Sequence, residues 1–158
     1  LSALIKTEYP ELSDRLVLQA RDVKFATFVA SYKTFYKSGQ RPILVGLGPA
    51  WTGLNLSDDD VKPQSDTLLT DLIIGCCPIG LNQSPTMLRR VELTNTAAIS
   101  KEALLTLKQG LGRLIRRNFV KERHIWILDG RLWSDKWLAS FTGPAKRLLS
   151  QYKNVSYF

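Results

Sequence analysis

The sequence predicts an α/β fold in which helices cover both faces of a central parallel sheet. Short apolar runs that suit buried strands alternate with longer segments whose apolar residues recur at helical spacing, and this alternation is typical of parallel sheets. With 158 residues, 44% of them hydrophobic and 23% charged, the chain has the length and composition of one globular domain. We therefore expect a single α/β domain over residues 1–158.

Strand and helix candidates alternate in the first half of the chain. Residues 15–20 (RLVLQA) form a short apolar strand candidate, and residues 24–38 follow with a helical pattern that Gly39 closes. Residues 42–47 (PILVGL) and 68–76 (LLTDLIIGC) are apolar runs bounded by turn residues, and we expect both to be buried strands. Aromatic residues of the helix are expected to lie in the core and not to stack on bases: Tyr32, Phe35 and Tyr36.

The second half begins with an irregular segment and a long helix. Residues 78–95 are rich in turn formers, and their pattern indicates neither helix nor strand. Residues 100–117 have a helical pattern, with Ser100 as the expected N-cap and Glu102 in the first turn.

The remaining elements follow the same alternation. Residues 125–128 (IWIL) predict a strand, residues 134–152 predict a helix with a break at residues 143–144, and residues 155–158 suit a last strand. Ligands of parallel sheets gather at the carboxyl ends of the strands. Two segments are expected there: residues 129–131 and the loop that begins at Gly48.

Charge is distributed unevenly along the chain. The net charge is +8, but residues 1–80 carry 8 Lys/Arg against 9 Asp/Glu, net −1, whereas residues 81–158 carry 14 against 5, net +9. A basic half of this kind suits a surface that binds a polyanion such as nucleic acid, although a solvated basic face gives the same composition.

Composition argues against several other classes. The apolar runs are too short to cross a membrane, and no signal peptide is visible at the N-terminus, which lacks an initiator Met and suggests a fragment. Cys76 and Cys77 are adjacent, so an ordinary disulfide between them is not expected, and a reducing, cytoplasmic setting is favoured. Together with His124 they lack the spacing of a metal site, and no metal is predicted.

The strongest local pattern is KQGLGRLIRR at residues 108–117. Gln109, Arg113 and Arg116 are spaced four and three apart, so they share one helix face and can converge on one target. Arginine binds phosphate oxygens in a bidentate way and stays charged at every relevant pH. Two glycines within one turn, Gly110 and Gly112, each cost about 1 kcal/mol relative to alanine, so a close approach of a backbone or a phosphate is expected there. The opposite face is apolar and is expected to pack on the sheet: Leu107, Leu111, Leu114 and Ile115.

This segment resembles helicase motif VI in the form Q-G-x-G-R-x-I-R of the DinG- and XPD-like helicases of superfamily two. In that family the motif is followed by a strand that ends in D-x-R, and residues 125–131 (IWILDGR) match it. Residues 46–56 (GLGPAWTGLNL) partly resemble motif V, whose family form has an aromatic residue followed by E-G-x-D. Trp51 and Gly53 fit this form, whereas two positions depart from it: Thr52 stands for the glutamate and Asn55 for the aspartate.

The resemblance implies a RecA-like three-layer fold and the second motor domain of an ATP-dependent helicase. It assigns the arginine finger to Arg116, a second phosphate contact to Arg113 and the orientation of water or a neighbouring loop to Gln109. Further nucleotide contacts are expected from Gly53, Asn55 and Gly112. Nucleic-acid contacts are expected from Trp51, Thr52, Arg89 and Arg90. Trp51 suits either a base stack or an anchor on the core, and both arginines suit either a DNA backbone contact or plain surface charge.

Cofactors and partners follow from the same resemblance. The sequence contains no G-x-x-x-x-G-K-[ST] phosphate loop, so ATP and Mg²⁺ are expected to bind mainly to a first motor domain outside this chain. The expected partners are that domain and single-stranded DNA, or RNA, with 5′ to 3′ movement. Divergence in the motif V segment also suggests the DinG-like proteins of some CRISPR systems, which adds a CRISPR effector complex as a partner.

Two other functions stay open at this point. A degenerate helicase module would keep the basic surface but lack coupling, as Thr52 and Asn55 suggest. A metabolic α/β enzyme with an arginine pocket is less favoured because the D-G-R sequence follows the motif at family spacing. A dinucleotide fingerprint at residues 46–48 is rejected because a third glycine is misplaced and no helix is expected after it.

Overall fold

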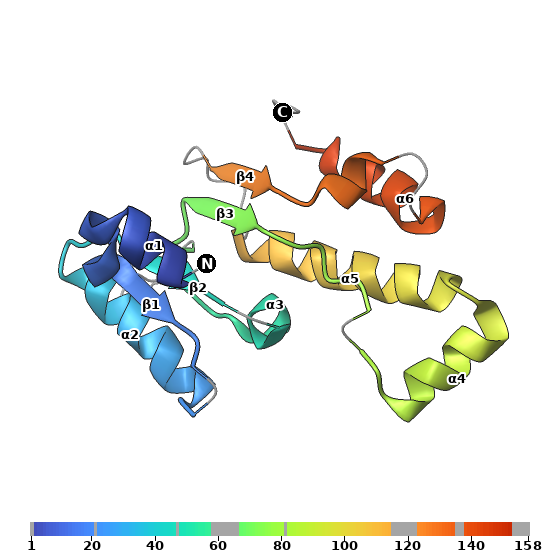
Figure 1. The fold of residues 1–158 in the computed structure, drawn as a ribbon, viewed down its shortest axis with the longest axis horizontal. Coiled ribbons are helices and arrows are strands. Elements are labelled where there is room, and N and C mark those ends of the chain that lie inside the picture. Colours follow the sequence, from blue (N-terminus) through green and yellow to red (C-terminus); the bar gives the residue numbers. More distant parts are fainter. Residues whose placement is uncertain are drawn as a thin grey trace. The chain divides into compact units, whose positions relative to one another are not determined.

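The computed structural model describes residues 2–20, 22–46, 48–57, 67–80, 82–114, 123–134 and 138–152. It shows a mixed α/β chain with helices and small parallel sheets (Figure 1). The chain divides into two compact units, which are described separately: unit 1 comprises residues 1–69 and 115–121, and unit 2 comprises residues 70–114 and 122–158. Within the described ranges, no helix combines the length and apolarity needed to cross a bilayer.

Unit 1 is built on a parallel strand pair. Leu16 pairs with Ile43 and Leu18 with Val45, which joins strands β1 and β2. The described elements of this unit run in the order α1 (Ser2–Glu8), η1 (Pro10–Arg15), β1 (Leu16–Leu18), α2 (Phe25–Lys37), β2 (Ile43–Val45) and α3 (Gly48–Gly53). The two predicted strands and the predicted helix between them are therefore confirmed, with shorter strands than the apolar runs suggested.

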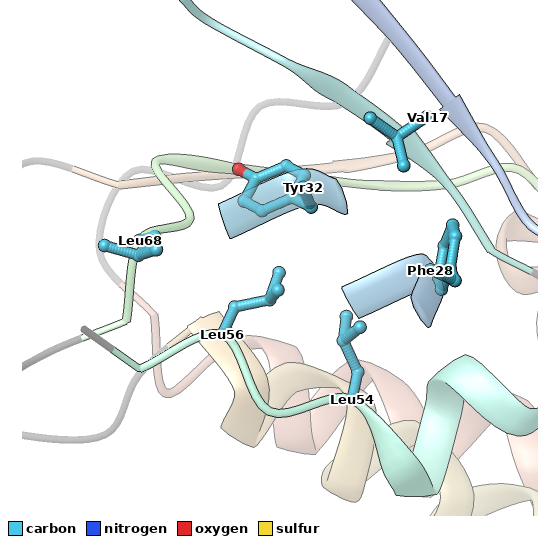
Figure 2. Packing of buried hydrophobic residues seen from close by; sticks show 6 residues of the cluster. All are labelled: Val17, Phe28, Tyr32, Leu54, Leu56 and Leu68. Atoms are coloured by element: carbon cyan, nitrogen blue, oxygen red, sulfur yellow. The ribbon is translucent and has the colours of Figure 1, made fainter. Parts of the chain in front are cut away.

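The core of unit 1 lies between α2, β1 and the chain that follows α3 (Figure 2). Its buried side chains are Val17, Phe28, Tyr32, Leu54, Leu56 and Leu68. Phe35 packs against this cluster, and burial raises the pKa of Tyr32 to about 12. The prediction that the aromatic residues of this helix belong to the core is confirmed for Tyr32 and Phe35, whereas Tyr36 is 38% exposed.

Gly39 ends α2 because its backbone enters the left-handed region, with φ of 81°. Its N–H donates to the carbonyl of Tyr36 (3.1 Å), and the next N–H, that of Gln40, donates to Phe35 (3.2 Å). Glycine adopts this φ without the penalty that a Cβ atom brings, so it satisfies the last carbonyls of the helix and redirects the chain into β2.

Unit 2 is built on a second parallel pair. Asp71 pairs with His124 and Ile74 with Ile127, so β3 and β4 join although they lie far apart in sequence. The described elements are β3 (Asp71–Ile74), α4 (Pro85–Thr94), α5 (Ala97–Leu114), β4 (His124–Ile127), η2 (Gly130–Trp133) and α6 (Ala139–Leu149). The strands predicted at residues 68–76 and 125–128 are confirmed, with bounds that differ by one to three residues.

Helix α4 occupies most of the segment for which the sequence pattern indicated no structure. Ser84 is its N-cap, and the Ser84 hydroxyl accepts a hydrogen bond from the Met87 N–H (3.3 Å). Pro85 takes the first helical position, where its missing N–H has no consequence. Only Met87 among the residues of α4 is buried, so this helix has no apolar stripe that a sequence pattern could reveal.

Helix α5 begins at Ala97, so the prediction of Ser100 as its N-cap is wrong. Ser100 is buried within the helix; its hydroxyl lies 3.1 Å from the Thr96 carbonyl and 2.6 Å from the Ser140 hydroxyl. Glu102 is consequently not in the first turn. The predicted end of this helix, residues 115–117, lies outside the described residues.

Helix α6 passes through residues 143–144, where a break was expected. Pro144 cannot donate to a carbonyl one turn earlier, which normally weakens a helix interior. Packing outweighs that loss here, because Phe141 and Ala145 on either side of it are 0% exposed and Leu149 is also buried. The helix starts at Ala139 and not near residue 134, and the strand predicted at residues 155–158 lies outside the described residues.

We expect Leu107→Ala to lower the free energy of unfolding by about 2–5 kcal/mol, because it removes a 0% exposed side chain from the core of unit 2. Leu105→Ala on the same helix is the matched control: Leu105 is 53% exposed, and its loss should change stability by about 0.5 kcal/mol or less. Urea unfolding followed by circular dichroism measures both, and equal effects of the two variants would contradict the described packing of α5.

Candidate functional site

The last turns of α5 carry the residues of the motif VI resemblance. Gln109 and Gly112 are exposed and Arg113 is half-buried, whereas Leu111 and Leu114 are 0% exposed. Helical spacing places Gln109 and Arg113 one turn apart on a common side, opposite the leucines that fill the core. The predicted division of this helix into a polar and an apolar face is confirmed over its described part. Arg116 and Ile115 lie outside the described residues.

The two glycines of this motif differ in their surroundings. Gly110 is buried. A Cβ atom added at Gly112 would meet no atom of another part of the described chain within 4 Å. The expected close approach at Gly112 is therefore not made by the described residues, none of which gives a packing reason for a glycine that weakens α5.

The end of α5 is held by the start of β4. Arg123, directly before β4, donates a guanidinium hydrogen bond to the carbonyl of Leu114. A cation near the carboxyl end of a helix interacts favourably with the helix dipole.

The segment of the motif V resemblance forms a short helix in unit 1. The expected loop at Gly48 is instead α3, so the sequence prediction that no helix follows this glycine is wrong. The backbone at Gly46 lies close to α3: a Cβ atom on this residue would lie only 2.5 Å from the Ala50 Cβ, so a larger residue would not fit. The glycine spacing still differs from a dinucleotide fingerprint.

The predicted contact residues of this segment have local structural roles. A Cβ atom at Gly53 would lie 3.1 Å from the Phe25 ring, so glycine lets α2 pack closely. The Asn55 carboxamide oxygen accepts from the Ser57 N–H (3.3 Å) and hydroxyl (3.0 Å), which forms a local turn. Trp51 is half-buried and Thr52 is exposed.

Arg89 and Arg90 lie on α4 and not in an irregular segment as expected. Arg89 forms an exposed ion pair with Glu92 (2.7 Å), which partly neutralises its charge. Arg90 is exposed on the same helix. Gln109, Gly112 and Arg113 thus share α5, whereas the motif V residues belong to unit 1.

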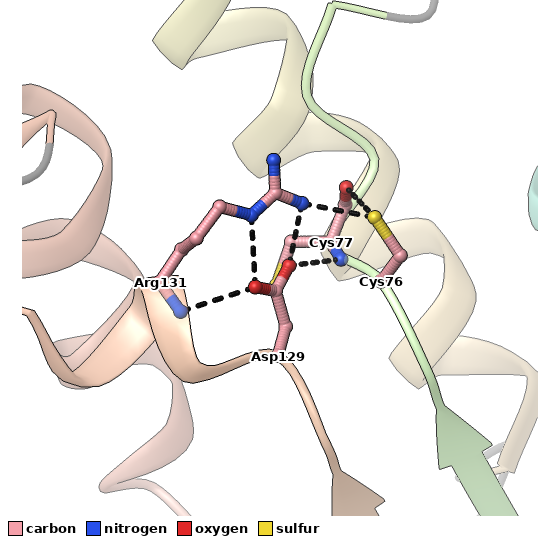
Figure 3. Close-up of polar contacts among 4 residues, drawn as sticks. All are labelled: Cys76, Cys77, Asp129 and Arg131. Carbon is pink, nitrogen blue, oxygen red and sulfur yellow. Dashed lines mark hydrogen bonds and ion pairs between the residues drawn. The ribbon is translucent and has the colours of Figure 1, made fainter.

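A buried carboxylate joins the carboxyl ends of β3 and β4 (Figure 3). Asp129, which follows β4, accepts from the backbone N–H of Cys77 at 2.7 Å, although the two residues are 52 positions apart. The Arg131 guanidinium binds the same carboxylate through both of its oxygens, at 2.7 and 2.8 Å, and the Arg131 N–H adds a further bond at 3.1 Å. The D-G-R sequence therefore forms a junction between strands.

The role of the cysteines in this junction was not visible in the sequence, because it depends on the pairing of two distant strands. Hydrogen bonds from Arg131 hold the pKa of Asp129 well below its usual range, so the carboxylate is charged at neutral pH. Burial, with the nearby Asp129 charge, raises the pKa of Cys77 to about 12, which keeps that thiol protonated and unreactive. Cys76 is exposed and its sulfur accepts from Arg131 at 2.9 Å.

A second polar cluster lies at the opposite end of the same strands. The Asp71 carboxylate accepts from the Trp126 indole at 3.3 Å and lies 3.2 Å from the His124 Nδ1. Burial raises the pKa of Asp71, but hydrogen bonds from Thr70 and Trp126 and the interaction with His124 outweigh it and lower that pKa. His124 is thus engaged with a carboxylate. Among the described residues, no three His, Cys, Asp or Glu side chains gather as a metal site would require.

We expect Asp129→Asn to lower the free energy of unfolding by about 2–3 kcal/mol at pH 7, because it removes the charge that binds Arg131 and Cys77. The pKa of Asp129 is lower in the folded than in the unfolded chain, so its stabilisation is complete above about pH 5 and is lost as the pH falls toward 2. The difference between wild type and variant should shrink over that interval.

Asp14→Asn is the control for this titration, because Asp14 is exposed and its replacement should change stability by about 0.5 kcal/mol or less. Denaturant unfolding at several pH values measures all three proteins. If the difference in stability between wild type and Asp129→Asn stayed constant from pH 7 to pH 2, the charge of Asp129 would not be what stabilises the junction.

Comparisons of this chain with models of protein families and with curated proteins find no match.

Proposed function

We propose that this chain is the second, RecA-like motor domain of an ATP-dependent helicase of the DinG/XPD kind. In this role it supplies arginines to an ATP molecule bound mainly by a first motor domain, and it contacts single-stranded nucleic acid. The observation that carries the proposal is the end of α5, where a Q-G-x-G-R sequence presents Gln109 and Arg113 on a helix whose opposite face is wholly buried.

The anchoring of α5 supports a role that requires precise positioning. Leu107, Leu111 and Leu114 are 0% exposed, and Arg123 binds the last described carbonyl of the helix. A phosphate ligand on such a helix loses little conformational freedom on binding, which is what a preorganised catalytic arginine needs.

Gly112 supports an approach from outside the described residues. It weakens an exposed helical position by up to about 1 kcal/mol, and no neighbour in the described chain occupies the space that a side chain would take. A partner backbone or a nucleotide phosphate at this position gives glycine a reason that packing among the described residues does not give.

The basic surface of unit 2 supports binding to nucleic acid. Exposed cationic side chains are carried by each of its described α-helices: Arg90 on α4, Lys101 and Lys108 on α5, and Arg147 on α6. Contacts with phosphates would release counterions, so binding to single-stranded DNA should weaken steeply with salt.

A degenerate binding module is the second candidate, and Asn55 favours it. In a coupled motor this position would face nucleotide or DNA, whereas here its carboxamide oxygen is used by Ser57 within a local turn. The two candidates share the basic surface but differ in whether the α5 arginines matter for ATP turnover.

We expect Gly112→Ala to raise the free energy of unfolding of the chain by about 0.5–1 kcal/mol and yet to lower ATP turnover when the chain acts with its first motor domain. Gly143→Ala on α6 is the matched control, because a Cβ atom there has ordinary contact distance (3.7 Å) to Arg147. The control should leave turnover unchanged. Normal turnover by Gly112→Ala would remove the argument for an external contact at this position.

We expect Arg113→Ala and Arg116→Ala to lower nucleic-acid-stimulated ATP turnover by about 10²-fold and 10³-fold respectively, with nearly unchanged ATP binding, in the protein that joins this chain to its first motor domain. The chain alone lacks a phosphate loop and should not hydrolyse ATP. Lys6→Ala is the control, since Lys6 is an exposed cation of unit 1 to which no nucleotide or nucleic-acid contact is assigned. If all three variants kept wild-type turnover, the degenerate module would be the better assignment.

A further inference from the structure

A groove runs between α5 and α6 on the surface of unit 2 and has a volume of about 400 Å³. Aliphatic side chains form its floor: Leu104 and Leu105 from α5, and Pro144 and Leu148 from α6. Leu105 is 53% exposed. The hydroxyls of Ser100 and Ser140, which also border the groove, lie 2.6 Å apart and bind each other, so they leave the groove largely apolar.

The lining positions follow one face of each helix. On α5 they include residues 101, 104, 105 and 108, and on α6 residues 140, 144 and 148, which are spacings of three and four. The α5 side extends from residue 97 to residue 108, about 16 Å or three helical turns. A groove of this length and shape suits an amphipathic helix of about 12 residues that inserts aliphatic anchors.

The rim of the groove is basic. Lys101 and Lys108 border it and are exposed, and neither forms an ion pair within the part of the chain that the structure describes. Glu102, the acidic residue next to Lys101, is bound instead to the Asn82 side chain at 2.5 Å. An occupant with carboxylates placed against these two lysines, which lie seven residues apart on α5, would therefore be electrostatically complementary.

From the apolar floor and the basic rim we infer that this groove binds an acidic amphipathic helix of a partner protein. Single-stranded nucleic acid fits less well, because none of the described residues that line the groove is aromatic and could stack a base, and aliphatic side chains form its floor. A second copy of this chain is disfavoured because its net charge of +8 would be brought against a basic rim.

The groove adjoins the nucleotide-binding side of α5 proposed above but is lined by other residues. Leu105 lies one turn before Gln109, about 40° away around the helix, whereas Lys108 points about 100° away from Gln109 and about 140° away from Arg113. Binding of a helix in the groove therefore does not depend on the motor assignment.

The test uses the whole 158-residue chain and a panel of fluorescein-labelled, 12-residue stapled helical peptides. Each peptide has leucines at positions i, i+3, i+4 and i+7 flanked by glutamates, and the panel varies their register. We expect saturable binding of at least one peptide by fluorescence anisotropy. Binding should weaken about 10-fold or more in Lys101→Glu/Lys108→Glu, because two favourable rim charges become repulsive, and similarly in Leu105→Asp.

Matched controls separate the groove from general surface charge and hydrophobicity. Lys6→Glu/Lys24→Glu reverses two exposed lysines of unit 1, and Leu93→Asp alters a leucine on α4 that is 69% exposed; both should bind the peptide as wild type does. Circular dichroism checks that every variant is folded.

Four results would overturn the proposal. The first is that no acidic peptide binds more tightly than about 100 μM, and the second is that a panel with lysine in place of glutamate binds equally well. The third is an equal loss of binding in the groove variants and the control variants. The fourth is displacement of the peptide by a single-stranded thymidine oligonucleotide whose own binding is lost in Leu105→Asp. Self-association that Leu105→Asp abolishes, measured by sedimentation, would assign the groove to a second copy instead. Normal peptide binding by Arg113→Ala is expected whether or not the motor assignment holds.

Discussion

Unit 2 depends on the buried carboxylate of Asp129. It binds the backbone N–H of Cys77 beyond β3 and the guanidinium of Arg131 beyond β4, and so it joins the carboxyl ends of two strands that meet only in the folded chain. Without Asp129 the buried N–H of Cys77 would lack this partner, which costs about 1–3 kcal/mol in a protein interior. The same bonds hold the pKa of Asp129 well below its usual range and keep the junction charged. η2 follows directly, and its Leu132 is 0% exposed.

The residues of this junction stabilise the fold, and other residues of unit 2 are available to a ligand. The charge of Arg131 is matched by Asp129, which suits a structural role, and burial keeps the Cys77 thiol protonated. In contrast, the end of α5 exposes Gln109 and Gly112 while its leucines are buried. A helix anchored on one side and polar on the other can hold an arginine in a fixed place for a phosphate, and this arrangement underlies the proposed motor function.

Helix α5 combines two surfaces with different chemistry. The side that carries Gln109 and Arg113 suits an anion, whereas the groove beside α6 combines aliphatic residues with the two lysines of its rim. Because Leu105 and Gln109 lie one turn apart, the two surfaces adjoin on the same helix. The buried face of α5 fixes both surfaces, since Leu107 and Leu111 set the rotation of the helix on its core.

Local patterns in the sequence were sufficient to predict strands β1 to β4, helix α2 with its end at Gly39, and the buried leucines of α5. Periodicity and glycine stereochemistry act over a few residues and are therefore visible in the sequence. Non-local contacts decided the rest. Ser100 lies buried within α5, where its hydroxyl forms a hydrogen bond with that of Ser140. Helix α6 continues through Pro144 because Phe141 and Ala145 are packed on the core. The pairing of Cys77 with Asp129 required β3 and β4 to lie side by side, and a contact across 52 residues leaves no periodic trace in the sequence.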